Sequence, residues 1–109
     1  MLLVFAVAGT SCGPTLGDLN ANPEKYYEQK VSVRGRVSRR QLFPDQALLE
    51  LADTHERRII VRMRGSDWPD VDEWVKVTGV LVGELDVDGN TVYDAIAAER
   101  VRGSRRPRF

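Results

Sequence analysis

The stretch Val31-Ser32-Val33-Arg34-Gly35-Arg36-Val37 alternates apolar and polar residues and has a glycine at its fifth position. The same pattern returns 44 residues later in Val75-Lys76-Val77-Thr78-Gly79-Val80-Leu81. Alternation with a period of two and a high valine content predicts a β-strand with one buried face. A glycine inside a strand is typical of a bulge, a tight bend or a close backbone approach. Two bent strands of this kind predict a small, strongly coiled barrel rather than a flat sheet.

The segments around this repeat predict three more strands and several turns. The five expected strands cover residues 31–40, 47–52, 57–64, 74–82 and 91–101. A hairpin turn is expected at Asp88-Gly89-Asn90, because Asp-Gly pairs favour tight turns between strands. Asn22 before Pro23 predicts the cap of a short N-terminal helical turn. The acidic run after Pro69 predicts a single helical turn between the third and fourth strands.

Three strands, a helical turn and two further strands follow one another in the order of the OB-fold, a five-stranded Greek-key barrel. The segment Asn22-Pro23-Glu24-Lys25-Tyr26-Tyr27, followed by the first glycine strand, resembles the opening of small bacterial single-domain OB-fold proteins. Their later strand is similar to Trp74-Val75-Lys76-Val77-Thr78-Gly79-Val80-Leu81. The resemblance covers about residues 16–102 and implies an all-β barrel with a short N-terminal helix. A different five-stranded barrel, such as an SH3-like one, remains the alternative.

The N-terminal segment predicts a cellular location. An apolar run at 2–8 precedes three small residues and the only cysteine, Cys12. This layout resembles the signal of bacterial lipoproteins, in which the cysteine is lipidated and becomes the first mature residue. We therefore expect a signal segment at 1–11, an OB-fold domain at 12–102 and a basic disordered tail at 103–109. The expected location is the cell envelope, lipid-anchored and facing the periplasm or the exterior; a cytoplasmic protein with a free thiol is the alternative.

The formal net charge is zero, but the charges are unevenly distributed. Residues 30–64 hold nine basic and four acidic residues, whereas 67–99 hold nine acidic residues and one lysine. The alternation places five arginines on one outer face as a candidate ligand-binding set: Arg34, Arg36, Arg58, Arg62 and Arg64. Guanidinium groups bind phosphates and carboxylates through paired hydrogen bonds. The alternative is that these arginines form weak cross-strand ion pairs with Glu50 and Glu99.

These features predict a monomeric, non-catalytic binding module that needs no cofactor and no metal ion. Its expected partner is an anionic glycan, a lipid headgroup or an envelope protein. The alternative is a single-stranded nucleic-acid-binding protein, and a purely structural accessory module is a third possibility. Nucleic acid is disfavoured because the second and third strands contain no aromatic residue on which bases could stack. Catalysis is disfavoured because the only histidine, His55, lies in a predicted turn without a nucleophile beside it.

Overall fold

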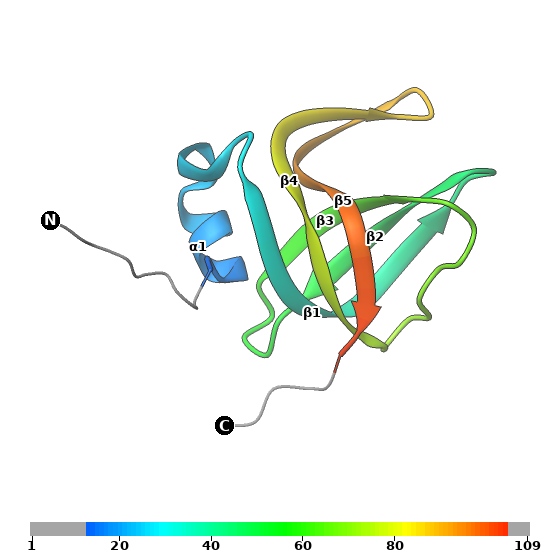
Figure 1. Cartoon of the computed structure of the whole chain (residues 1–109), viewed down its shortest axis with the longest axis horizontal. Coiled ribbons are helices and arrows are strands. Elements are labelled where there is room, and N and C mark those ends of the chain that lie inside the picture. Colours follow the sequence, from blue (N-terminus) through cyan, green and yellow to red (C-terminus); the bar gives the residue numbers. More distant parts are fainter. Residues whose placement is uncertain (1–12, 105–109) are drawn as a thin grey trace, which may run out of the picture.

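The computed structural model describes residues 13–104. The expected signal segment, the expected lipidation at Cys12 and residues 105–109 of the expected tail lie outside the described residues. Within them, two short helices precede five strands (Figure 1). These elements are α1 (Leu16–Ala21), the 3₁₀ helix η2 (Pro23–Tyr26), β1 (Lys30–Leu42), β2 (Gln46–Ala52), β3 (Arg58–Arg64), β4 (Trp74–Val87) and β5 (Asn90–Gly103). The predicted mainly β architecture is confirmed, and no helix between residues 13 and 104 is long and apolar enough to cross a membrane.

The five strands form one sheet that closes into a ring in the order β1-β2-β3-β5-β4. Four of the contacts are antiparallel, including the pairing of β1 with β4 that completes the ring. The contact between β3 and β5 is parallel and spans only Ile60–Arg62 opposite Ala95–Ala97. The ring is therefore held weakly at one place, where β5 leaves β3.

The predicted alternation along the strands places the core inside the ring. On β1, Val31, Val33 and Val37 are buried, and on β3, Ile59 and Val61 are buried. Helix α1 covers one end of the ring with its two buried leucines, Leu16 and Leu19. Burial of these aliphatic side chains is the main source of stability of such a small domain.

The predicted helical turn that begins at Pro23 is confirmed as η2, with Asn22 at its N-cap position, but the expected capping hydrogen bond of the Asn22 side chain is wrong. Asn22 precedes η2, but its side chain makes no capping hydrogen bond. The cap lies earlier in the chain, at Thr15, whose hydroxyl accepts from the backbone N–H of Asp18. The Asp18 carboxylate accepts in return from the backbone N–H of Thr15. This capping box satisfies two backbone donors that the first turn of a helix leaves without partners, and it begins α1, a further helix that precedes η2.

The expected helical turn between β3 and β4 is also wrong, because residues 65–73 contain bends and a turn but no helix. The backbone groups of this loop bond to β1 instead. Asp72 donates its N–H to the carbonyl of Val37 at 2.7 Å, and Val37 donates to Glu73 at 2.9 Å. The Arg40 guanidinium also donates to the carbonyl of Pro69 at 2.9 Å. These long-range bonds hold the loop extended against β1.

Beyond the ring, β4 and β5 continue as a two-stranded arm formed by residues 83–94 (Figure 1). The predicted hairpin turn is confirmed at its tip, where Asp88 and Gly89 both have positive φ angles of 52° and 86°. At the root of the arm, the Tyr27 hydroxyl donates a hydrogen bond to the Asp94 carboxylate. This bond to an anionic acceptor raises the pKa of Tyr27 to about 12. The bond also links η2 to the arm and fixes the direction in which the arm leaves the ring.

Candidate functional site

A groove of about 360 Å³ lies on the outer face of the sheet, between the arm and strands β1 to β3. Its apolar surface comes from Leu48 on β2, Ile60 on β3 and Val92 on the arm. Leu48 and Ile60 lie close together because of the register of β2 and β3. In this register Leu48 is opposite Arg62, and Glu50 is opposite Ile60. Its remaining lining residues are Arg39, Arg40, Gln41, Leu49 and Glu50. The groove therefore combines aliphatic side chains with a basic border.

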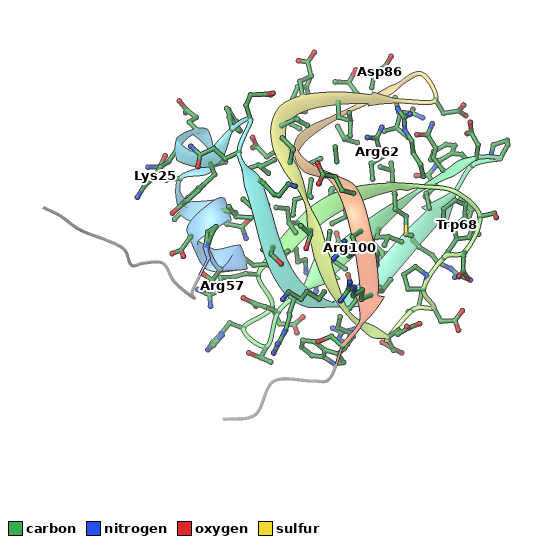
Figure 2. The ribbon with its side chains drawn as sticks, viewed as in Figure 1. Lys25, Arg57, Arg62, Trp68, Asp86 and Arg100 are labelled. Atoms are coloured by element: carbon green, nitrogen blue, oxygen red, sulfur yellow. The ribbon has the colours of Figure 1, made fainter. Side chains whose placement is uncertain are left out.

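Arg62 stands on β3 directly opposite Leu48, on the same outward side as Ile60. Figure 2 shows it between β3 and the arm of β4 and β5. Its Nε atom is buried and has no hydrogen-bond partner among residues 13–104. Burial lowers the pKa of the Arg62 guanidinium, and the nearby positive charge of Arg64 lowers it further. A half-buried guanidinium without an anionic partner is unfavourable for the free protein, so this position is suited to an anionic ligand.

Two of the five predicted arginines are engaged by carboxylates. Arg58 contacts Glu50 at 2.8 Å and Glu56 at 2.9 Å. Arg36 contacts Asp72 at 3.1 Å and Glu56 at 3.8 Å. The alternative of cross-strand ion pairs is thus realised for Arg58 with Glu50. These two arginines contribute to the outer surface of the sheet, but their charge is already balanced.

Glu50 is the centre of this ion-pair network. Its carboxylate accepts from the Ser38 hydroxyl at 2.8 Å and also from Arg58 and Arg39. The hydrogen bond from Ser38, followed by those from the two arginines, holds the pKa of Glu50 below its usual value. The second expected acceptor, Glu99, contacts Lys30 at 3.0 Å rather than an arginine. The Glu50 carboxylate therefore neutralises part of the positive charge at one end of the groove.

The structure therefore divides the five predicted site residues into three groups. Arg62 and Arg64 lie on β3 beside the groove, and within residues 13–104 neither forms an ion pair. Arg36 and Arg58 belong to the ion-pair network. Arg34 is opposite Lys76 of β4 and faces away from the groove. The five do not form one free cationic surface, because the register of β1 sends its arginines to different neighbours.

Sequence reasoning did not find Arg39, Arg40 and Val92 as groove residues. A register shift between Val37 and Arg39 places Arg39, rather than Ser38, opposite Glu50. Val92 reaches the groove because the arm extends over the outer face of β2 and β3. The sequence signal for Arg39 and Arg40 is a run of polar residues that interrupts the alternation of a long strand, as at a bulge. The sequence signal for Val92 is an apolar residue next to a predicted hairpin turn.

His55 and the acidic side chains are the remaining candidates for a site within residues 13–104. His55 lies in the turn between β2 and β3, where its backbone N–H donates to the Asp53 carboxylate at 2.8 Å. Its ring Nδ1 lies 3.2 Å from the guanidinium of Arg57. No group of three or more possible metal ligands occurs between residues 13 and 104. The groove is therefore the feature on which a function can be built.

Comparison with known proteins supports the fold alone. No family model matches this chain, and no curated protein matches its sequence. Among solved structures it is similar to a crystal structure from Leishmania major Friedlin of a protein assigned as an aspartyl-tRNA synthetase. The TM-score is 0.61 at 15% identity, over 98% of this chain and 24% of that protein. The chain thus matches about a quarter of the length of that protein.

Proposed function

We propose that this chain is a non-catalytic OB-fold binding module of the bacterial cell envelope, whose groove binds an anionic ligand. The strand order β1-β2-β3-β5-β4 supports an OB-fold, because it is the order of that five-stranded Greek-key barrel. OB-folds bind ligands over strands two and three, between the loops that join strands one to two and four to five. The groove lies in that region, between the ends of β1 and β2 and the arm.

The observation that carries the proposal is Arg62, which is half-buried opposite the groove-lining Leu48 and forms no ion pair within residues 13–104. A carboxylate or phosphate placed there accepts two parallel hydrogen bonds from the guanidinium fork. Leu48, Ile60 and Val92 offer an apolar surface to the rest of the ligand. The C–H face of a pyranose ring fits such a surface, so an acidic glycan satisfies both requirements. Lipid headgroups and acidic segments of envelope proteins share the anionic chemistry but lack the apolar ring.

Single-stranded nucleic acid is the second candidate, and the groove fits it less well. No lining residue of the groove is aromatic, although stacking contributes about 1–3 kcal/mol per base in proteins that bind single strands. The arm also carries Glu84, Asp86 and Asp88, of which Asp86 is visible in Figure 2. These carboxylates repel any anion, and the repulsion is greatest for a polyphosphate, which carries a charge at every nucleotide along the groove.

Replacing Arg62 by glutamine should weaken binding of a uronic-acid oligosaccharide about 10- to 100-fold, because a hydrogen bond to a charged group contributes about 1.5–3 kcal/mol. Isothermal titration calorimetry measures the change. Arg34→Gln is the matched control, since Arg34 is an arginine of the same sheet that faces away from the groove. Its affinity should equal that of the wild type. Equal affinity of Arg62→Gln and wild type would exclude this site, and tighter Arg62-dependent binding of oligothymidylate would favour nucleic acid.

The proposed location is tested separately through Cys12. We expect the wild-type chain, expressed in a bacterium, to fractionate with membranes and to carry a diacylglyceryl group that intact-mass spectrometry detects. Cys12→Ser should lose both the added mass and the membrane association, because the thiol is the acceptor of the lipid. An unmodified soluble chain that begins at Met1 would contradict the envelope location and leave the groove proposal standing.

A further inference from the structure

A row of three cations crosses the outer face of β1, β4 and β5, which lie side by side in Figure 1. Arg34 of β1 is directly opposite Lys76 of β4, and Lys76 is directly opposite Arg102 of β5. The preceding or following residues on these strands, Val33, Val77 and Val101, pack in the core. Because side chains alternate between the two faces of a strand, the three cations point outward. We call these three residues the basic row.

The basic row forms no ion pair in the part of the chain that the structure describes. Within residues 13–104, none of its three side chains forms an ion pair or a side-chain hydrogen bond. Of the carboxylates near the row, Glu99 contacts Lys30 and Asp72 contacts Arg36, whereas Glu73 lines a polar pocket together with Arg102 at one end of the row. Like charges that face each other across strands destabilise a sheet. The row therefore opposes the stability of the fold, which points to a binding role.

Arg100 and Trp74 extend this surface. Arg100 precedes Arg102 by two residues on β5 and is opposite Thr78 of β4; its label is near the centre of Figure 2. Trp74 precedes Lys76 by two residues on β4, on the same outward side, and is half-buried. Cations beside a tryptophan are typical of surfaces that meet the interface of a bilayer. The face is the outside of a closed ring and lies apart from the groove, so it suits a broad partner better than a small ligand.

Both ends of the described chain leave from this side of the molecule. A Cβ atom at Gly13 would lie 4.0 Å from the carbonyl oxygen of Ser32 on β1. Ser104 donates its N–H to the carbonyl of Trp74 at 2.8 Å. The residue before Gly13 is Cys12, and one residue spans at most about 3.6 Å. The described chain therefore begins beside β1, close to the basic row.

We propose that the basic row docks on the anionic lipid headgroups of the membrane that holds the protein. This inference rests on the proposed envelope location, because a lipid on Cys12 would bring β1 to that surface. The two acyl chains of a diacylglyceryl group would hold the protein at the bilayer, and the basic row would add electrostatic attraction to anionic headgroups. The row also fixes the orientation: β1, β4 and β5 face the bilayer, and the groove between the arm and β2–β3 stays open to solvent.

The test uses full-length Cys12→Ser protein, so that no lipid group on residue 12 contributes to vesicle binding. We expect it to co-sediment with vesicles of equal parts phosphatidylglycerol and phosphatidylcholine, and not with phosphatidylcholine alone. Adding Lys76→Gln and Arg102→Gln should weaken this binding about 30-fold, since each basic residue near an anionic surface contributes about five-fold. The matched control adds Lys25→Gln and Arg57→Gln, which remove the same charge from η2 and from the turn that precedes β3. The control should bind the vesicles as before.

A second readout separates docking from damage to the fold. The melting temperature of the Lys76→Gln/Arg102→Gln protein should equal or exceed that of its parent, because the substitutions relieve the repulsion in the row. Equal losses of vesicle binding in the row variant and the control would overturn the proposal. So would a row variant that keeps its vesicle binding but loses binding to oligothymidylate, which would assign the face to nucleic acid. Glycan binding that depends on Arg62 is unaffected by any of these outcomes.

Discussion

Replacing Gly79 by alanine should prevent folding or lower the free energy of unfolding by about 3 kcal/mol or more, at the upper end of overpacking effects. A Cβ atom at this position would lie 2.3 Å from the carbonyl oxygen of Ala97 and 2.8 Å from the Cα atom of Ala98. Both are backbone atoms of β5, so no side-chain rotation can relieve the overlap. Unfolding in urea, followed by the fluorescence of the partly buried Trp68, measures the loss.

Gly103→Ala is the matched control for this change. Gly103 is the last residue of β5, and a Cβ atom there has only the Glu73 carboxylate nearby, at 3.9 Å. Its free energy of unfolding should stay within about 0.5 kcal/mol of the wild-type value, the range of an ordinary surface substitution. A Gly79→Ala protein with the wild-type midpoint would show that β4 and β5 do not approach each other as closely as described.

Much of the ring can be predicted from the sequence because its strands carry strong local signals. Val31, Val33 and Val37 alternate with polar residues, and this alternation alone assigns the inner face of β1. The arm is different. Predicted strand four ended at residue 82, whereas β4 continues to Val87. Residues 83–94 have few apolar neighbours in sequence, and their direction depends on the contact of Tyr27 with Asp94, which lie 67 residues apart.

The loop between β3 and β4 shows how distant contacts override a local pattern. The acidic residues after Pro69 favour the start of a helix. The structure instead uses the backbone groups of Asp72 and Glu73 to continue the hydrogen bonding of Val37 on β1. Arg40 adds a bond to the carbonyl of Pro69. A pattern within nine residues cannot reveal partners that lie some thirty residues earlier in the chain.

The candidate site could not be predicted in full, because it depends on which residues are opposite each other on neighbouring strands. The amino-acid composition carries no information on this strand register. Arg58 and Arg62 are four residues apart on the same outward side of β3, and their sequence surroundings are alike. Their environments differ because Arg58 reaches the Glu50 carboxylate, whereas Arg62 is opposite the apolar Leu48. The bulge after Val37 adds Arg39 to the same carboxylate. Cross-strand register therefore decides which arginine is balanced and which is open to a ligand.

Replacing Gly35 by valine should lower the free energy of unfolding by about 1–3 kcal/mol, the usual range for overpacking a well-packed core. Gly35 is the counterpart of Gly79 in the first copy of the repeat, but its obstacles differ. A Cβ atom would lie 3.0 Å from the Cβ of Leu51 and 3.2 Å from the carbonyl oxygen of Ala52. Both neighbours belong to β2, and small shifts of that strand can relieve part of the overlap.

The alanine variants of the two glycines give the sharper comparison, because they add the same single carbon atom. Gly35→Ala should fold with a modestly lowered urea midpoint, whereas Gly79→Ala should lose most of its stability. The difference follows from the closest distances, 3.0 Å to a side-chain atom at Gly35 and 2.3 Å to a backbone atom at Gly79. Equal midpoints of the two variants would mean that the repeat imposes one common strand bend. Unequal midpoints in the expected order would assign the tighter constraint to the β4–β5 crossing, at which the register of the two strands shifts.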